Sequence, residues 1–266
     1  MPLSHRSGIT GVHWWDAAFP NPSNTGFPNS ATLTTYTGPA TITTDNTVID
    51  SVIFQPSFGR LTIQANNVTI QNSLHYCTDF FAFFSQTNAF NVKNTTIVGP
   101  YDTGTSGIST DFGGNFDRVV IRGFENFFVG GGVGTITNCY MYDLQNSATA
   151  HPDGIQFGGG QTNWLVQHNR IEVCGNAGIY ITTDFGDITG ITCIGNLILM
   201  KPGDPANFAM FIDQKVAGGH TITNIVQTDN ILQRGFLGYE SNNIPSQLTW
   251  ARNIDYITNA QIAQNS

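Results

Sequence analysis

Acidic side chains stand at the ends of short apolar segments, and they are the residues best suited to chemistry in this sequence. Glu125 and Asp153 each precede such a segment, whereas Asp184 and Asp213 each follow one. Glycoside hydrolysis needs one carboxylic acid and one carboxylate. Two carboxyl groups held close together raise the pKa of one of them, which supplies the acid. We therefore predict two candidate catalytic pairs, Asp153 with Glu125 first and Asp184 with Asp213 second.

The neighbours of Asp153 strengthen the first pair. His151 lies two residues before it, in the sequence HPDG, and we expect the imidazole to orient the carboxyl group. Asp153 would then be the acid or nucleophile and Glu125 its partner, while in the second pair either aspartate can be the acid. The alternative is a structural role, in which the side chain of each aspartate hydrogen-bonds to the backbone nearby and stabilises a turn. The side chains that we expect to bind substrate are Gln156, Tyr180, Asp111, Lys215, Trp14 and Trp15. The alternative role of the two tryptophans is an apolar cap over the first coil.

Charge and composition exclude several functions. The 266 residues include 10 basic and 18 acidic side chains, for a net charge of −8. Such a chain is poorly equipped to neutralise phosphates, so we expect no nucleic-acid partner. It has no apolar run of 18 or more residues, so we expect no membrane span. The cysteines match no zinc-binding spacing and are expected to be buried thiols; they are Cys77, Cys139, Cys174 and Cys193.

Two short units alternate along the chain and predict the architecture that positions these side chains. The first unit has β-prone residues, one Asn and further apolar residues; the Asn positions are 72, 94, 138, 169, 196, 230 and 253, with Gly123 assigned to the same place. The second unit is an apolar strand that falls between consecutive members of the first. Short strands without a helical period argue against βαβ units, and few two-residue turns argue against a hairpin sandwich.

We therefore predict an all-β chain that forms a single right-handed parallel β-helix, with about one strand per face in each coil and a coil spacing of about 4.8 Å. The expected divisions are an N-terminal cap and coil entry over residues 1–45, the helix over 46–241, and a last coil and cap over 242–266. The recurring Asn is expected to bind turn backbone or the Asn one coil away.

Stacking turns sequence spacing into columns. We align the second unit on Gly107, Asn126, Gly154, Gly178, Asn207 and Gly235. This alignment makes Glu125 the vertical neighbour of Asp153, and Asp184 the vertical neighbour of Asp213. It leaves no basic residue at the position between the last two.

The sequence resembles the right-handed parallel β-helix, pectate-lyase-like superfamily over roughly residues 40–255. The closer likeness is to secreted β-helix proteins of actinobacteria and to related phage tail proteins. It is carried by the stretches PSNTGFPNSATLTTYTGPATIT, NNVTIQNS, HPDGIQFGGG and NILQRGFLGY. The resemblance implies a polysaccharide partner, an extracellular or virion-associated location, and a monomer or homotrimer. The chemistry of this superfamily varies, and the aspartate pattern of polygalacturonases is absent here.

Three functions follow as hypotheses. A glycoside hydrolase is favoured because acid pairs occur on an acidic, lysine-poor chain. A non-catalytic phage tail or cell-surface glycan-binding module is the alternative. A polysaccharide lyase, with Lys215 or His151 as the base, is the third. We expect no cofactor; Ca²⁺ held by Asp79, Glu125 and Asp153 is the alternative to a catalytic role for these acids.

Overall fold

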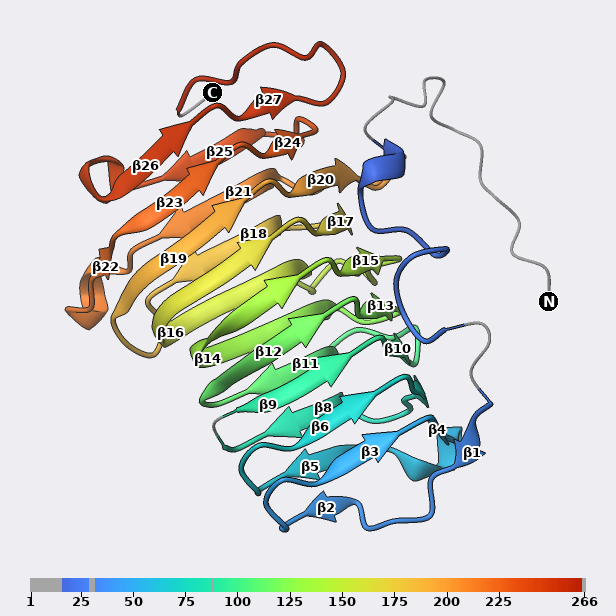
Figure 1. Cartoon of the computed structure of the whole chain (residues 1–266). Coiled ribbons are helices and arrows are strands. Elements are labelled where there is room, and N and C mark those ends of the chain that lie inside the picture. The colour runs from blue at the N-terminus through green and yellow to red at the C-terminus, as the bar shows by residue number, and fades with distance from the viewer. Residues whose placement is uncertain (1–15, 29–31, 88, 265–266) are drawn as a thin grey trace.

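The computed structural model describes residues 16–28, 32–87 and 89–264 and is a parallel β-helix (Figure 1). Each coil contributes about one strand to each of three sheets, here named A, B and C, whereas the alternating sequence units had indicated two strand families. Within each sheet, consecutive coils pair in parallel. Among the described residues, no helix has the length and apolarity needed to cross a membrane.

Sheet A has ten strands, one from each successive coil. They are β1 (Thr34–Thr35), β4 (Val52–Phe54), β7 (Leu74–Tyr76), β10 (Thr96–Val98), β13 (Val120–Arg122), β15 (Tyr140–Tyr142), β17 (Arg170–Val173), β20 (Leu197–Met200), β24 (Ile231–Leu232) and β27 (Ile254–Asp255).

Sheets B and C are joined because two long strands, β14 and β16, run through both. Sheet B contains β2 (Thr41–Ile42), β5 (Leu61–Ile63), β8 (Phe81–Ser85), β11 (Ser106–Thr110), the first halves of β14 (Asn126–Thr137) and β16 (Asp153–Gln167), β18 (Ala177–Thr182), β21 (Phe208–Asp213) and β25 (Gly238–Asn242). Sheet C contains β3 (Val48–Asp50), β6 (Thr69–Gln71), β9 (Phe90–Lys93), β12 (Gly113–Asp117), the second halves of β14 and β16, β19 (Ile188–Ile194), β22 (Ile222–Thr223), β23 (Ile225–Thr228) and β26 (Leu248–Ala251). Short 3-10 turns interrupt the coils at η2 (Pro56–Phe58), η3 (Val216–Gly218) and η4 (Pro245–Gln247), and a further one, η1 (Asp16–Ala18), precedes the first coil.

The core is built from one inward-facing set of side chains in each strand. In sheet B, Ile155 pairs with Ile179, which pairs with Met210, and all three are fully buried. Aromatic rings form a second stack, in which Phe116 contacts Phe128 at 5.1 Å between centroids. The four cysteines are free and buried, as expected from their spacing. Burial of like residues above one another therefore stabilises the coil repeat.

Glycine runs lie where β14 and β16 cross from sheet B to sheet C. A Cβ on Gly131 would lie 2.3 Å from the carbonyl oxygen of Asp111, which rules out a larger residue. Gly132 also has a φ of 63°, in the left-handed region that glycine adopts at no steric cost. The runs, Gly130 to Gly132 and Gly158 to Gly160, thus act as tight corners.

The corner between sheets C and A explains the recurring Asn. In each coil a residue with positive φ is followed by one whose side chain points inward. The positive-φ residues are Ser51, Asn72, Asn94, Arg118, Asn138, His168, Gly195, Asp229 and Arg252. The repeated Asn therefore belongs to two adjacent columns, because positions 72, 94 and 138 occupy the first place and positions 169, 196, 230 and 253 the second. The assignment of Gly123 to this corner was wrong: Arg118 holds the place, since Gly123 follows the next strand, β13.

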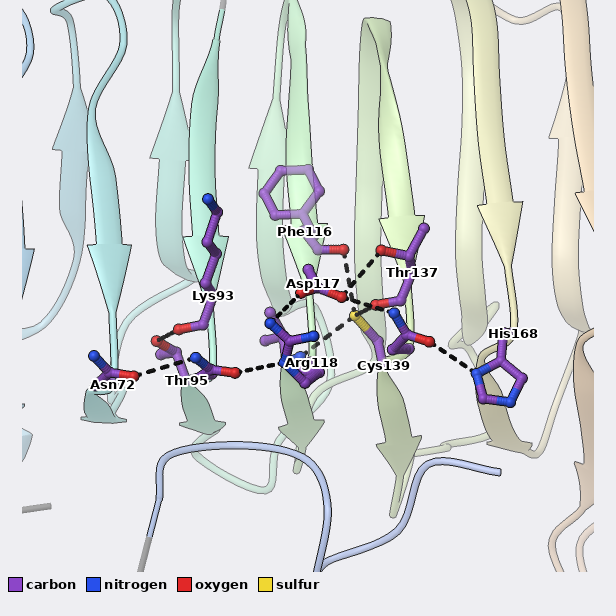
Figure 2. A network of polar contacts seen from close by, with 12 residues as sticks. Asn72, Lys93, Thr95, Phe116, Asp117, Arg118, Thr137, Cys139 and His168 are labelled. Carbon is purple, nitrogen blue, oxygen red and sulfur yellow. Dashed lines mark hydrogen bonds and ion pairs between the residues drawn. The ribbon is translucent and has the colours of Figure 1, made fainter. Parts of the chain in front are cut away.

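Figure 2 shows the outer column of this corner as a chain of polar contacts from coil to coil. Asn94 donates from Nδ2 to Asn72 Oδ1 at 3.2 Å and accepts from Arg118 Nε at 2.7 Å. Asn138 donates to Asp117 Oδ1 at 2.8 Å, and its Oδ1 lies 2.8 Å from His168 Nδ1. Asn tolerates the left-handed conformation and still reaches its neighbour, which explains why it recurs here.

The inner column is a buried asparagine ladder. Asn169 donates to Asn196, Asn196 to Asn230 and Asn230 to Asn253, with Nδ2–Oδ1 distances of 3.0, 3.0 and 2.9 Å. Each Asn also donates to a backbone carbonyl and accepts a backbone N–H, so its amide is satisfied although it is fully buried. The predicted Asn-to-Asn contacts are confirmed for these four residues.

The described part of the N-terminal segment, residues 16–28, lies along the outer face of sheet A (Figure 1). Phe19 packs against Leu197, Leu199 and Tyr256, and its ring stacks on His168. Further along, the amide of Gly26 donates to the carbonyl of Arg118 at 2.9 Å. We call residues 16–28 the strap, because they connect coils that are far apart along the helix axis.

Candidate functional site

The outer face of sheet B carries a groove of about 410 Å³. Its lining residues are His151, Asp153, Gln156, Asn176, Tyr180, Asp184, Phe211, Asp213 and Lys215. Seven of these were predicted from the sequence as site residues. The structure therefore brings members of both predicted pairs to one surface. A second hollow, of about 440 Å³, lies at the corner of sheets C and A between Asn138, His168 and Gly195 and contains no carboxyl group.

The floor of the groove is a column of outward side chains from three successive coils. The register pairs Gln156 of β16 with Tyr180 of β18, and Tyr180 with Phe211 of β21. The Tyr180 and Phe211 rings are stacked, with centroids 5.2 Å apart and planes at 22°. Phe208 adjoins Phe211 at 5.3 Å. Parallel pairing with an unbroken register thus creates an aromatic platform on this part of the face.

Asp153 lies at the start of β16, at one end of the groove, and is 1% exposed. Its Oδ1 accepts hydrogen bonds from Asn176 Nδ2 at 2.9 Å and from the backbone N–H of Ala177 at 3.1 Å. Burial raises the pKa of the Asp153 carboxyl well above its ordinary value; the two hydrogen bonds oppose this shift, and the nearby charge of Glu125 adds to it. Asp153 therefore holds its proton more tightly than an exposed aspartic acid.

Glu125 is displaced by one residue from its expected position beside Asp153. The register pairs Phe128 with Ile155, which places Asn126 opposite Asp153, and Asn126 Oδ1 accepts the Asp153 backbone N–H at 2.9 Å. The Glu125 carboxylate instead accepts the backbone N–H groups of Gly104 and, at 3.4 Å, of His151. It lies outside the groove lining and ties two loops together, so the expected vertical pairing with Asp153 was wrong.

The opposite end of the groove contains Asp213, Lys215 and Asp184. Asp213 pairs with Thr182 and not with Asp184, because β21 enters the sheet two residues later than the aligned segments suggested. Lys215 Nζ forms an ion pair with Asp213 Oδ2, and this hydrogen bond raises the pKa of the lysine. Lys215 therefore neutralises Asp213, so Asp213 and Asp184 do not form an isolated pair of like charges. Asp184 is exposed, beyond the end of β18.

The separation of the two ends limits the chemistry. Asp153 pairs with Ala177, and Asp213 pairs with Thr182, five residues further along the same strand. Five strand residues span about 16 Å. The carboxyl groups of hydrolytic pairs lie within roughly 9.5 Å, so Asp153 and Asp213 cannot act together on one glycosidic bond.

The remaining predicted residues lie elsewhere. Asp111 is exposed between β11 and β12 and lies outside the groove lining, and partial burial raises its pKa. Trp14 and Trp15 fall outside the described residues. Across the described ranges, no three His, Cys, Asp or Glu side chains are placed to hold a metal ion.

Asn176 and Phe211 were not identified from the sequence as site residues. The signal for each was available, because Asn176 lies two residues before the GIYITT segment (residues 178–183) and Phe211 occupies the outward position that Tyr180 occupies one coil earlier. Each lies beside a residue that the sequence analysis had named, because Asn176 donates to Asp153 and Phe211 stacks on Tyr180.

Comparisons with known proteins leave the function open. No protein-family model matches the sequence, and no curated protein matches it. A solved structure to which the fold is similar is the crystal structure of the Dettilon tailspike protein (gp208), with 14% sequence identity and a TM-score of 0.32. The alignment covers 80% of this chain and 60% of the tailspike chain, so this chain spans less than two thirds of that protein. The likeness to pectate-lyase-like and actinobacterial proteins remains a prediction.

Proposed function

We propose that the groove on sheet B binds a polysaccharide chain. The observation that carries the proposal is the stacked Tyr180–Phe211 platform, which lies in a groove with hydrogen-bonding groups at both ends. Flat aromatic surfaces bind the apolar faces of sugars, while a few placed polar groups fix orientation. Both types of group come from consecutive coils of sheet B. A polysaccharide ligand agrees with the extracellular or virion-associated location expected from the sequence.

Charge narrows the class of glycan. The chain has a net charge of −8, and the one lysine of the groove lining is already paired with Asp213. A polyuronate would be repelled by this field and would find little cationic surface to bind. The glycan is therefore neutral or weakly charged. The pairing of Lys215 also weakens a lyase mechanism in which this lysine is the base.

Binding is tested on an array of bacterial, plant and algal glycans with the fluorescently labelled protein. We expect the wild type to bind a subset of neutral glycans and Tyr180→Ala to lose this binding. Phe112→Ala is the matched control, because Phe112 is 51% exposed and does not line the groove. No binding by the wild type, or equal binding by wild type and Tyr180→Ala, would contradict the proposal.

Hydrolysis of the bound glycan is the second candidate function, and the raised pKa of Asp153 favours it. A buried acid that keeps its proton is suited to protonate a leaving oxygen. The charge of Glu125 contributes to the raised pKa of Asp153, so Glu125 is the candidate second carboxylate; Asp213 is too distant.

The catalytic candidate is tested on a glycan that the array identifies. We expect the wild type to release reducing ends and Asp153→Asn to reduce turnover by about 100-fold or more while binding is retained. Unsaturated products that absorb in the ultraviolet would indicate elimination instead. Binding without product in the wild type would leave the non-catalytic binding module as the function.

A further inference from the structure

We propose that a second aromatic subsite, formed by Phe80, Phe81 and Phe84 at β8, binds a distant part of the same glycan chain. The inference rests on the proposed function of the groove and extends it to ligand length. Its ligand is a neutral or weakly charged polysaccharide that is long enough to reach both aromatic sites. No residue of this subsite lines the groove.

The two sites are connected by the register of sheet B. The outward position of Tyr180 continues through Gln156 of β16, Val129 of β14 and Ser109 of β11 to Phe84 of β8. Each step is one coil, so Phe84 and Tyr180 belong to one straight column. Four coil spacings separate them by about 19 Å.

The aromatic geometry at the distant end resembles that of the groove. The Phe81 and Phe84 rings are stacked at 5.5 Å with an interplanar angle of 18°, compared with 5.2 Å and 22° for Tyr180 and Phe211. Phe80 meets Phe81 edge-on at 4.6 Å and is 53% exposed. The Arg60 guanidinium lies 5.9 Å from the centre of the Phe84 ring.

The fold does not explain these rings. The core positions of β8 are filled by Ala82 and Phe83, which are fully buried, so Phe81 and Phe84 point outward. Single exposed apolar side chains are common on protein surfaces, whereas three adjoining rings form a patch that indicates binding. Between the two aromatic sites the column consists of Ser109, Val129 and Gln156, and none of these three side chains is aromatic or charged.

The test uses an array that presents each glycan at several chain lengths, probed with wild type, Tyr180→Ala, Phe84→Ala and Phe84→Leu. The leucine variant keeps the apolar volume and removes only the ring, so it remains informative if the alanine variant does not fold. Phe112→Leu is the control, because Phe112 is an exposed phenylalanine between β11 and β12, outside the column.

We expect wild type to bind long members of a glycan series more tightly than short ones. Both Phe84 variants should bind short members normally and lose about three- to tenfold in affinity for long members. Tyr180→Ala should lose affinity for short and for long members alike. If short members bind normally and the Phe84 variants keep the wild-type advantage of long members, the second subsite is refuted while the groove proposal stands. If wild type binds no glycan, the groove proposal and this inference fall together.

Discussion

Replacing Asn196 by Ala should destabilise the protein more than any replacement in the outer column of the same corner. Asn196 is the second of the four stacked asparagines and is fully buried. Its Nδ2 donates to Val166 O at 2.9 Å and to Asn230 Oδ1 at 3.0 Å. Its Oδ1 accepts the backbone N–H and the Nδ2 of Asn169 at 3.1 and 3.0 Å. Alanine removes all four bonds and leaves every partner buried.

The magnitude follows from these contacts. A neutral hydrogen bond contributes about 1 kcal/mol, and a buried group left without its partner costs about 1–3 kcal/mol. Because two of the four partners keep a further bond within the ladder, we expect a loss on the order of 4 kcal/mol in the free energy of unfolding. Asn196→Asp should be as damaging, since a carboxylate oxygen would then face the carbonyl of Val166.

Equilibrium urea denaturation, followed by circular dichroism, measures the effect. Asn94→Gly is the matched control: Asn94 has a φ of 45°, which glycine also adopts, and its contacts are on the protein surface. We expect this variant to lose about 1 kcal/mol or less. Equal losses for Asn196→Ala and Asn94→Gly would refute the view that buried amide pairing holds the coils in register.

Three further predictions concern acid stability, the candidate acid and the strap. Burial among Phe54, Phe58 and Phe83 lowers the pKa of His75 from 6.5 to about 4. Above pH 6.5 the imidazole is neutral in both the folded and the unfolded state, and the protein has its full stability. As the pH falls towards 4, only the unfolded state takes up the proton, which lowers the free energy of unfolding by about 3 kcal/mol. His75→Phe should flatten this part of the stability profile in urea unfolding between pH 7.5 and 4, and an unchanged slope would contradict the assignment. Because the folded-state pKa of Asp153 is raised, Asp153→Asn should gain stability relative to wild type as the pH rises above 3.8, and thermal melts at pH 3.5 and 7.5 that show no such divergence would count against a buried acid. Phe19→Ala removes a ring that is 7% exposed and should speed proteolytic cleavage within residues 16–28, with a cost in unfolding free energy of about 2–4 kcal/mol; a cleavage rate equal to that of wild type would show that Phe19 does not anchor the strap.

The sequence alone predicts the coil repeat, the strand side chains that face the core, and a corner marked by Asn. Alternation within GIYITT (residues 178–183) and NFAMFI (residues 207–212) predicts Ile179, Ile181, Met210 and Ile212 in the core and Tyr180 on the surface, and these positions are confirmed. It also predicts Phe208 in the core, which was wrong, because Phe208 is only partly buried and contacts Phe211. These assignments depend on the two-residue period of a strand, which is local and does not change with the length of the loops. The recurring Asn likewise marked a corner, because few residues accept a left-handed backbone conformation.

The vertical neighbours of each residue were decided by the tertiary structure. Loops between strands vary in length, so segments that look equivalent in sequence enter the sheet at different points; Phe208, for example, pairs with Ala177 where the alignment had placed Ala206. This shift moved Asp213 opposite Thr182 and away from Asp184 in the register. The strap is a contact between segments far apart in sequence, and no local period predicts it. Coil register follows from interstrand hydrogen bonds and from packing against the coils on either side, and these depend on the whole stack and not on any one segment.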